Sequence, residues 1–184
     1  MKKLLKGRLQ ESFEFSSSIS RLETLSNKET AVVVLYFHRK EISDSALKAL
    51  ESFVESGGGL LALHSASASF KQNNRYFKLL GGRFTNHGRI SSFKVEPESD
   101  QGEIFQNITG FETRDELYIH QYTEDITVHF STETDDHREP VVWTRKLSKG
   151  KIVYFSLGHC ASVWKHPNVK SIMYQGLDWL EGIK

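Results

Sequence analysis

Three uninterrupted apolar runs constrain the fold of this chain more than any other feature. Their sequences are AVVVLYF at residues 31–37, LLAL at 60–63 and KIVYFSL at 151–157. Such runs, without polar alternation, are typical of strands that are buried on both faces. Between the first two, Ser43 or Asp44 can cap a helix that Gly57 to Gly59 end. This order of strand, helix and strand predicts a parallel sheet covered by helices.

The rest of the chain predicts further strands and a closing helix. Strand-like segments are FEFSSSIS at 13–20, ISSFKVE at 90–96, ITVHF at 126–130 and PVVWT at 140–144. Apolar residues recur at helical spacing between Val169 and Leu180, which predicts a helix that packs on the sheet. We therefore expect a single three-layer α/β domain over residues 1–184.

The composition of the chain disfavours several classes of binding partner. The net charge of +1 gives no general attraction for nucleic acid or an anionic membrane, and no run approaches the ~20 apolar residues of a membrane helix. The single cysteine, Cys160, cannot form an internal disulfide, which favours the cytoplasm. Gly57 to Gly59 precede a strand rather than follow one, so no nucleotide cofactor is predicted. A small-molecule partner is expected, and a homo-oligomer is left open.

The predicted strand ends carry histidines. His64 ends the second apolar run and His159 follows the last one, where ligands of open α/β sheets bind. Between them, alternation in DELYIHQY puts Glu116, Tyr118 and His120 on one face. A face made of carboxylate, phenol and imidazole is unlike a core, because each group would need a buried partner. Two further candidates are His87, in a glycine-rich turn, and Trp164, which could stack on a sugar ring.

The sequence around His64 has the pattern of a nucleophile elbow. This tight strand-to-helix turn needs small residues two positions either side of its central residue, and Ala62 and Ala66 meet that need. Two serines offer an alternative hydrolase triad, in which Ser65 or Ser67 acts with His159 and Asp115. Ser65 is also a candidate substrate-binding residue.

From Gly57 to the C-terminus the sequence resembles the trehalose-utilisation (ThuA-like) family. The resemblance is carried by GGGLLALHSASASF, LLGGRFTNHG, ITGFETRDELYIHQY, EPVVWTRKLSKGKIVYFSLGHCASVW and GLDWLEG. It implies a flavodoxin-like fold of the class I glutamine amidotransferase type, a mostly parallel sheet with helices on both faces. His64 then falls at the elbow and His159 at the later histidine of that fold.

This chain departs from the amidotransferase pattern at both positions that matter. The elbow holds His64 instead of cysteine, and Ala161 stands where that pattern has glutamate. Glutamine amidotransfer through a thioester is therefore excluded. The opening, MKKLLKGRLQES, also differs from the usual first strand of the family, so that strand is expected to be missing or reorganised.

The resemblance implies a carbohydrate-metabolism protein. We expect His64, Glu116 and His159 to act on a sugar or keto-sugar by acid–base chemistry, as a hydrolase, lyase or isomerase. Ser65, His87, Tyr118, His120 and Trp164 are the expected substrate-binding residues. The alternative from a different class is a module that binds a sugar without turnover.

The same side chains also offer metal ligands. His64, His87, His120, His159 and Glu116 supply the nitrogen and oxygen atoms that zinc or another divalent ion accepts. They are scattered along the chain without a metal-binding signature, so the sequence does not choose between a metal site and a metal-free one.

Overall fold

The computed structural model describes Leu5, residues 13–99 and residues 103–182. One mixed sheet of seven strands forms the centre, in the order β1-β2-β9-β8-β7-β4-β5, and β3 and β6 form a separate two-stranded ribbon. The strands are β1 (Val32–Leu35), β2 (Gly59–Leu63), β3 (Gly82–His87), β4 (Ser91–Pro97), β5 (Phe111–Asp115), β6 (Tyr118–Tyr122), β7 (Thr127–Glu133), β8 (Arg138–Leu147) and β9 (Gly150–Phe155).

Parallel pairing is confined to three strands. β1 pairs in parallel with β2, and β2 with β9, as the three apolar runs predict. From β9 through β8, β7 and β4 to β5 every pairing is antiparallel, so the sheet is mixed. The carboxyl ends of β2 and β9 consequently lie side by side, because neighbouring parallel strands end at the same edge.

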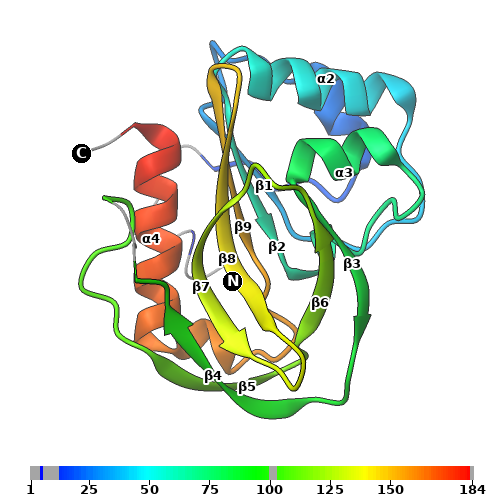
Figure 1. Ribbon diagram of the computed structural model, residues 1–184. Coiled ribbons are helices and arrows are strands. Elements are labelled where there is room, and N and C mark those ends of the chain that lie inside the picture. Colours follow the sequence, from blue (N-terminus) through cyan, green and yellow to red (C-terminus); the bar gives the residue numbers. More distant parts are fainter. Residues whose placement is uncertain (1–4, 6–12, 100–102, 183–184) are drawn as a thin grey trace.

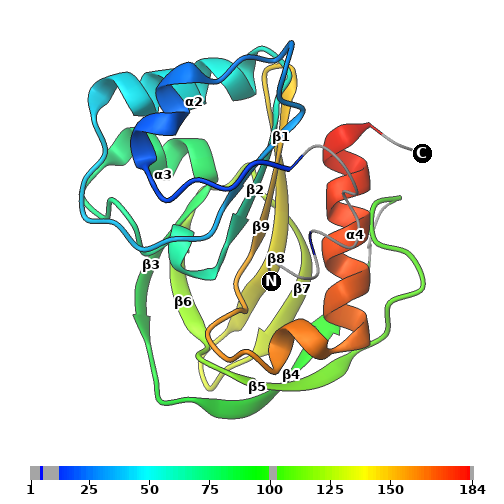
Figure 2. The ribbon, with the colours of Figure 1, turned by 180° about the vertical axis from the view of Figure 1, so that it is seen from behind.

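Helices lie on both faces of the sheet. Figures 1 and 2 show α4 on one face and α2 and α3 on the other, with β3 and β6 below α3. The helices are α2 (Asp44–Glu55), α3 (Asn74–Leu80) and α4 (Pro167–Glu181), and the short 3₁₀ turns are η1 (Ile19–Thr24), η2 (His64–Ala66) and η3 (Val163–Lys165). Within the described residues, no helix has both the length and the apolar character that a membrane crossing requires.

The side chains of β2 divide between the two cores. Leu61 and Leu63 pack in the core under α4, whereas Leu60 and Ala62 pack in the core under α2 and α3. All four are completely buried. A strand between two helical layers must be apolar on both faces, and this explains why its sequence does not alternate.

The helix ends follow the sequence signals. The Ser43 hydroxyl accepts a hydrogen bond from Ala46 N at the start of α2, as predicted. At the start of α3, Asn73 Oδ1 accepts hydrogen bonds from Arg75 N and Tyr76 N. Gly81, with φ +80°, ends α3 in the left-handed conformation that glycine adopts without strain.

Three predictions of local structure need correction. FEFSSSIS forms no strand: its last residues begin η1, and Ser16 to Ser18 interrupt the alternation of apolar residues that a half-buried strand needs. The glycine-rich turn expected around His87 is β3, which pairs with β6. FETRD, which was not predicted as a strand, is β5. The reorganised opening expected at MKKLLKGRLQES lies outside the described residues except for Leu5, which is buried in the core under α4.

Gly150 marks a close approach between β9 and α2. A Cβ atom at this position would overlap the Val54 carbonyl oxygen. We expect Gly150→Ala to lower the free energy of unfolding by about 2 kcal/mol, because backbone must move to make room. Urea unfolding measures the change. Gly88→Ala is the matched control, since nothing lies within 4 Å of its added Cβ, and an equal loss in both variants would contradict the packing argument.

Candidate functional site

His64 occupies the elbow between β2 and η2. Its φ of +42° lies in the left-handed region that a non-glycine residue seldom adopts, as the elbow interpretation requires. Ala62 and Ala66 are completely buried, and their small side chains let strand and turn approach closely. The His64 carbonyl accepts hydrogen bonds from the Tyr154 hydroxyl at 3.0 Å and the Ser67 hydroxyl at 3.2 Å. These bonds hold the backbone in its strained conformation.

The His64 ring is fixed by a bond to the neighbouring strand. Its Nδ1 lies 2.8 Å from the carbonyl oxygen of Ser156, one residue beyond the end of β9. A carbonyl only accepts, so the proton is on Nδ1 and Nε2 carries a lone pair. Burial lowers the pKa of His64, more than its carboxylate neighbours raise it, so the ring is neutral near pH 7.

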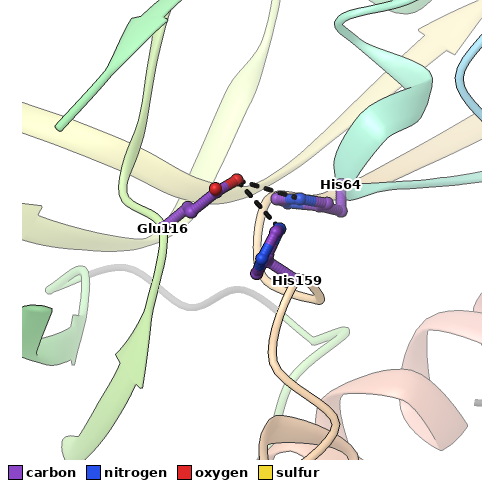
Figure 3. Close-up of side chains that lie close together, drawn as sticks. All are labelled: His64, Glu116 and His159. Carbon is purple, nitrogen blue, oxygen red and sulfur yellow. Dashed lines mark ion pairs between the residues drawn. The ribbon is translucent and has the colours of Figure 1, made fainter. Parts of the chain in front are cut away.

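Glu116 lies between several imidazoles, as Figure 3 shows for His64 and His159. Its Oε2 is 3.1 Å from His159 Nδ1 and 3.7 Å from His64 Nε2. Its other oxygen, Oε1, is 3.8 Å from His87 Nδ1. The three residues predicted to be catalytic, which are far apart in the sequence, therefore meet at one point.

Asp115 fixes the loop that carries His159. The Asp115 carboxylate is completely buried and accepts hydrogen bonds from Gly158 N at 2.6 Å and Cys160 N at 2.8 Å. Gly158 has φ +146°, and a Cβ there would come within 2.6 Å of the Trp164 ring. The side chains of Asp115 and Glu116 thus have different tasks: the first positions the His159 loop and the second faces the imidazoles.

A pocket of about 420 Å³ opens beside these groups. It is lined by Tyr36, His38, His64, Ser65, Ala68, Lys71, Phe84, His87, Tyr118 and His159. The Tyr118 ring lies 4.1 Å from the His64 ring and 4.4 Å from Phe84, measured between centroids. Burial and then Glu116 raise the pKa of Tyr118 to about 12, so its hydroxyl stays protonated and can donate a hydrogen bond.

Two of the expected substrate-binding residues do not line this pocket. His120 is buried, with Nδ1 2.9 Å from Glu139 Oε1 and Nε2 3.1 Å from the Tyr154 hydroxyl. Trp164 is also buried and packs against Tyr36 and Gly158. Alternation in β6 put Tyr118 and His120 on one face correctly, but of these two only Tyr118 lines the pocket, because Trp143 and Tyr154 pack on His120.

The serine triad is not formed. The Ser67 hydroxyl contacts His120 Nε2 at 3.2 Å and the Tyr154 hydroxyl at 2.7 Å, and the Asp115 carboxylate is used by backbone amides. Ser65 lines the pocket, but among the described residues no hydrogen bond joins it to His159. Burial and Asp115 raise the pKa of the Cys160 thiol, so this cysteine is not an activated nucleophile either.

The sequence did not single out five residues that line the pocket: Tyr36, His38, Ala68, Lys71 and Phe84. Tyr36 and His38 follow β1, so the rule that pointed to His64 could also have found them. Phe84 belongs to β3, which was not predicted as a strand, and Lys71 lies over its ring with Nζ 4.3 Å from the centroid.

A larger hollow of about 580 Å³ lies elsewhere, lined in part by Lys94, Glu96 and Arg138. These charges are already paired, since Lys94 Nζ is 2.6 Å from Glu96 Oε1 and Arg138 binds Glu98 and Glu133. None of the histidines contributes to this hollow. We therefore place the functional site at the smaller pocket.

These features define an α/β protein with a histidine-lined pocket at the carboxyl ends of adjacent parallel strands and a glutamate that contacts two of the pocket histidines. The sequence matches the family model described as ThuA, trehalose utilisation, over residues 2–180. The chain belongs to this family. A comparison with curated proteins found no match.

Solved structures agree with this assignment. A ThuA-like protein from Bacteroides uniformis superposes with a TM-score of 0.81 at 18% identity, over 97% of this chain and 82% of its own. A second, from Parabacteroides merdae, gives 0.81 at 16% identity, over 99% and 85%. A β-galactosidase from Bacillus circulans gives 0.64 at 12% identity, over 88% of this chain but 24% of that enzyme. At these identities the likeness shows the fold alone.

The role of Asp115 can be tested by Asp115→Ala. Two amide groups in the His159 loop then lose their acceptor, and we expect the free energy of unfolding to fall by about 2 kcal/mol. Hydrogen exchange should show faster exchange at the amides of Gly158 and Cys160, with β8 unchanged. Asp136→Ala, in an exposed turn, is the control. Unchanged protection at both amides would contradict the positioning role.

We expect the buried His120 side chain to make the free energy of unfolding depend on pH. Burial lowers its pKa in the folded protein, more than Glu139 raises it. Below about pH 6.5, His120 is therefore protonated in the unfolded chain but stays neutral in the folded protein. The contribution of His120 to the free energy of unfolding is complete above this pH and is lost as the pH falls. We expect losses of up to about 1.4 kcal/mol per pH unit from this group.

Urea unfolding at pH 7.5, 6.5 and 5.5 measures this dependence. In His120→Gln the decline should be shallower than in the wild type, whereas His38→Gln, at an exposed histidine, should leave it unchanged. An equally steep decline in His120→Gln would show that other groups are responsible.

Proposed function

We propose that this protein acts on a sugar or keto-sugar, with His64, Glu116 and His159 as the reactive centre. Membership of the trehalose-utilisation family assigns it coarsely to carbohydrate metabolism. The observation that carries the finer proposal is the meeting of one carboxylate with the two imidazoles at the mouth of the pocket. Imidazoles can exchange protons near neutral pH, and a carboxylate can orient them or act as a base, which suits elimination, isomerisation or hydrolysis beside a keto group.

The rest of the pocket suits a carbohydrate. Tyr118 and Phe84 offer aromatic faces to the apolar C–H groups of a sugar ring, and Ser65, Lys71 and His87 offer polar groups to its hydroxyls. The volume of about 420 Å³ is within the range of small-molecule sites. Since Cys160 is the only cysteine and needs no oxidising compartment, we place this activity in the cytoplasm.

The proposal divides the work among the three residues. His64, with its proton on Nδ1, presents the Nε2 lone pair as a base. Glu116 orients and polarises the imidazoles that it faces, and His159, whose side chain is 47% exposed, can exchange protons with substrate and solvent. A base and a proton donor at one point satisfy the geometric requirement for general acid–base catalysis.

Glu116→Gln tests this function while keeping the size of the side chain. Wild type is incubated with a panel of sugars, disaccharides and their keto derivatives, and products are followed by NMR. We expect turnover of at least one keto-sugar and a loss of ~100-fold or more in Glu116→Gln. The control, Glu112→Gln, changes an exposed glutamate on β5 and should keep wild-type rates.

Calorimetric measurement of sugar binding distinguishes an enzyme from a module that binds a sugar without turnover. If a sugar binds to the wild-type protein but is never converted, the protein is a sugar-binding module and not an enzyme. Absence of both binding and turnover across the panel would contradict the assignment of this pocket to carbohydrates.

A further inference from the structure

We infer that His64 Nε2, the Glu116 carboxylate and His159 Nδ1 form a binding site for one divalent transition-metal ion. The sequence left five candidate ligands open, and the fold selects three of them. One ligand atom from each of these residues lies within 4.8 Å of the other two. Figure 3 shows the two imidazoles and the carboxylate turned toward one another.

The spacing of the donor atoms fits a small ion. Ligands that are 2.0–2.2 Å from zinc in tetrahedral geometry lie about 3.3–3.6 Å from each other. Glu116 Oε2 is 3.1 Å from His159 Nδ1 and 3.7 Å from His64 Nε2. The donor atoms of the two histidines lie within 4.8 Å of each other, and movement of the exposed His159 side chain would close the remaining gap.

The orientation of His64 is the strongest observation. Its Nδ1–H donates to the Ser156 carbonyl, and metal-bound histidines commonly donate their second ring N–H to such an acceptor. The remaining nitrogen, Nε2, makes no hydrogen bond to the described residues and faces a carboxylate oxygen. His64 is only 4% exposed, so a buried lone pair is directed at a negative charge. A cation between the two acceptors would satisfy both.

Glu139 provides an internal comparison. It also lies between two histidines, with Oε1 2.9 Å from His120 Nδ1 and Oε2 2.8 Å from His137 Nε2. The His120 backbone N–H donates to it as well, at 3.1 Å. These are ordinary hydrogen-bond distances, and the carboxylate of this second cluster is satisfied by N–H donors. Glu116 Oε2 is 3.1 Å from His159 Nδ1 but 3.7 Å from His64 Nε2, which is too long for a hydrogen bond, so the first cluster, unlike the second, contains an imidazole that is not bonded to its carboxylate.

The donor set indicates which ions would bind. Two imidazoles and one carboxylate suit zinc, iron(II), cobalt or nickel, whereas magnesium and calcium prefer oxygen ligands. Three protein ligands leave at least one position free, and His64 and His159 both line the pocket. An ion there would take the His64 Nε2 lone pair, so the base would then be a water bound to the ion, whose pKa it lowers, and the ion would polarise a substrate oxygen. This catalytic consequence rests on the proposed function, but metal binding itself does not.

The test is zinc binding to tag-free protein stripped with a chelator. Isothermal titration should give one zinc ion per chain, and cobalt(II) should give visible absorption of a low-coordinate site. Glu116→Gln and His159→Ala should each weaken zinc binding by more than ~100-fold, because loss of a second-shell partner alone costs about 10- to 100-fold. His137→Gln removes a histidine from the Glu139 cluster and should bind like wild type. Circular dichroism establishes that each variant is folded.

Three results would overturn the metal site: no saturable zinc binding, equal affinity in wild type and both site variants, or loss of binding only in His137→Gln. No sugar is present in these titrations, so a negative result would contradict the metal site without contradicting the proposed function. Conversely, zinc binding by a protein that converts no sugar would support the metal site and contradict the proposed function.

Discussion

The hydrogen bond between His64 Nδ1 and the Ser156 carbonyl joins the ends of two adjacent parallel strands, and the site depends on it. It fixes the ring, the tautomer and the direction of the Nε2 lone pair. The His64 backbone is left-handed, and Tyr154 and Ser67 stabilise it through hydrogen bonds to the His64 carbonyl. The strain at the elbow is therefore held by a network that begins in the buried core.

Two carboxylates next to each other in the sequence complete the arrangement from the opposite side. Asp115 is buried and binds the backbone of the His159 loop, while Glu116 faces the imidazoles. Neighbours at the end of an extended segment point in opposite directions, so one can serve the scaffold and the other the pocket. The buried Asp115 thus fixes the backbone that carries His159, while its neighbour Glu116 stays available to the imidazoles, as a preorganised site requires.

The histidines divide into two groups with different physical roles. In the cluster of His120, Glu139 and His137, each polar atom of the carboxylate meets an N–H donor, and the cluster connects through Tyr154 to the elbow. At Glu116, by contrast, His64 Nε2 faces the carboxylate from 3.7 Å, which is beyond hydrogen-bond distance. Residue type alone does not separate the two groups, because both are built from imidazole and carboxylate. Only the distances and the tautomers do.

The sequence by itself determined the three parallel strands, the helix caps and the elbow, because each depends on local spacing and on the size of neighbouring side chains. It also placed His64 and His159 at strand ends, which a parallel sheet must bring together. It could not place His120 or Trp164, since whether a face of a strand is open depends on what packs against it from distant parts of the chain. The tertiary structure decided this: Trp143 and Tyr154 cover His120, and β3, formed where a turn was expected, brings Phe84 and His87 to the pocket.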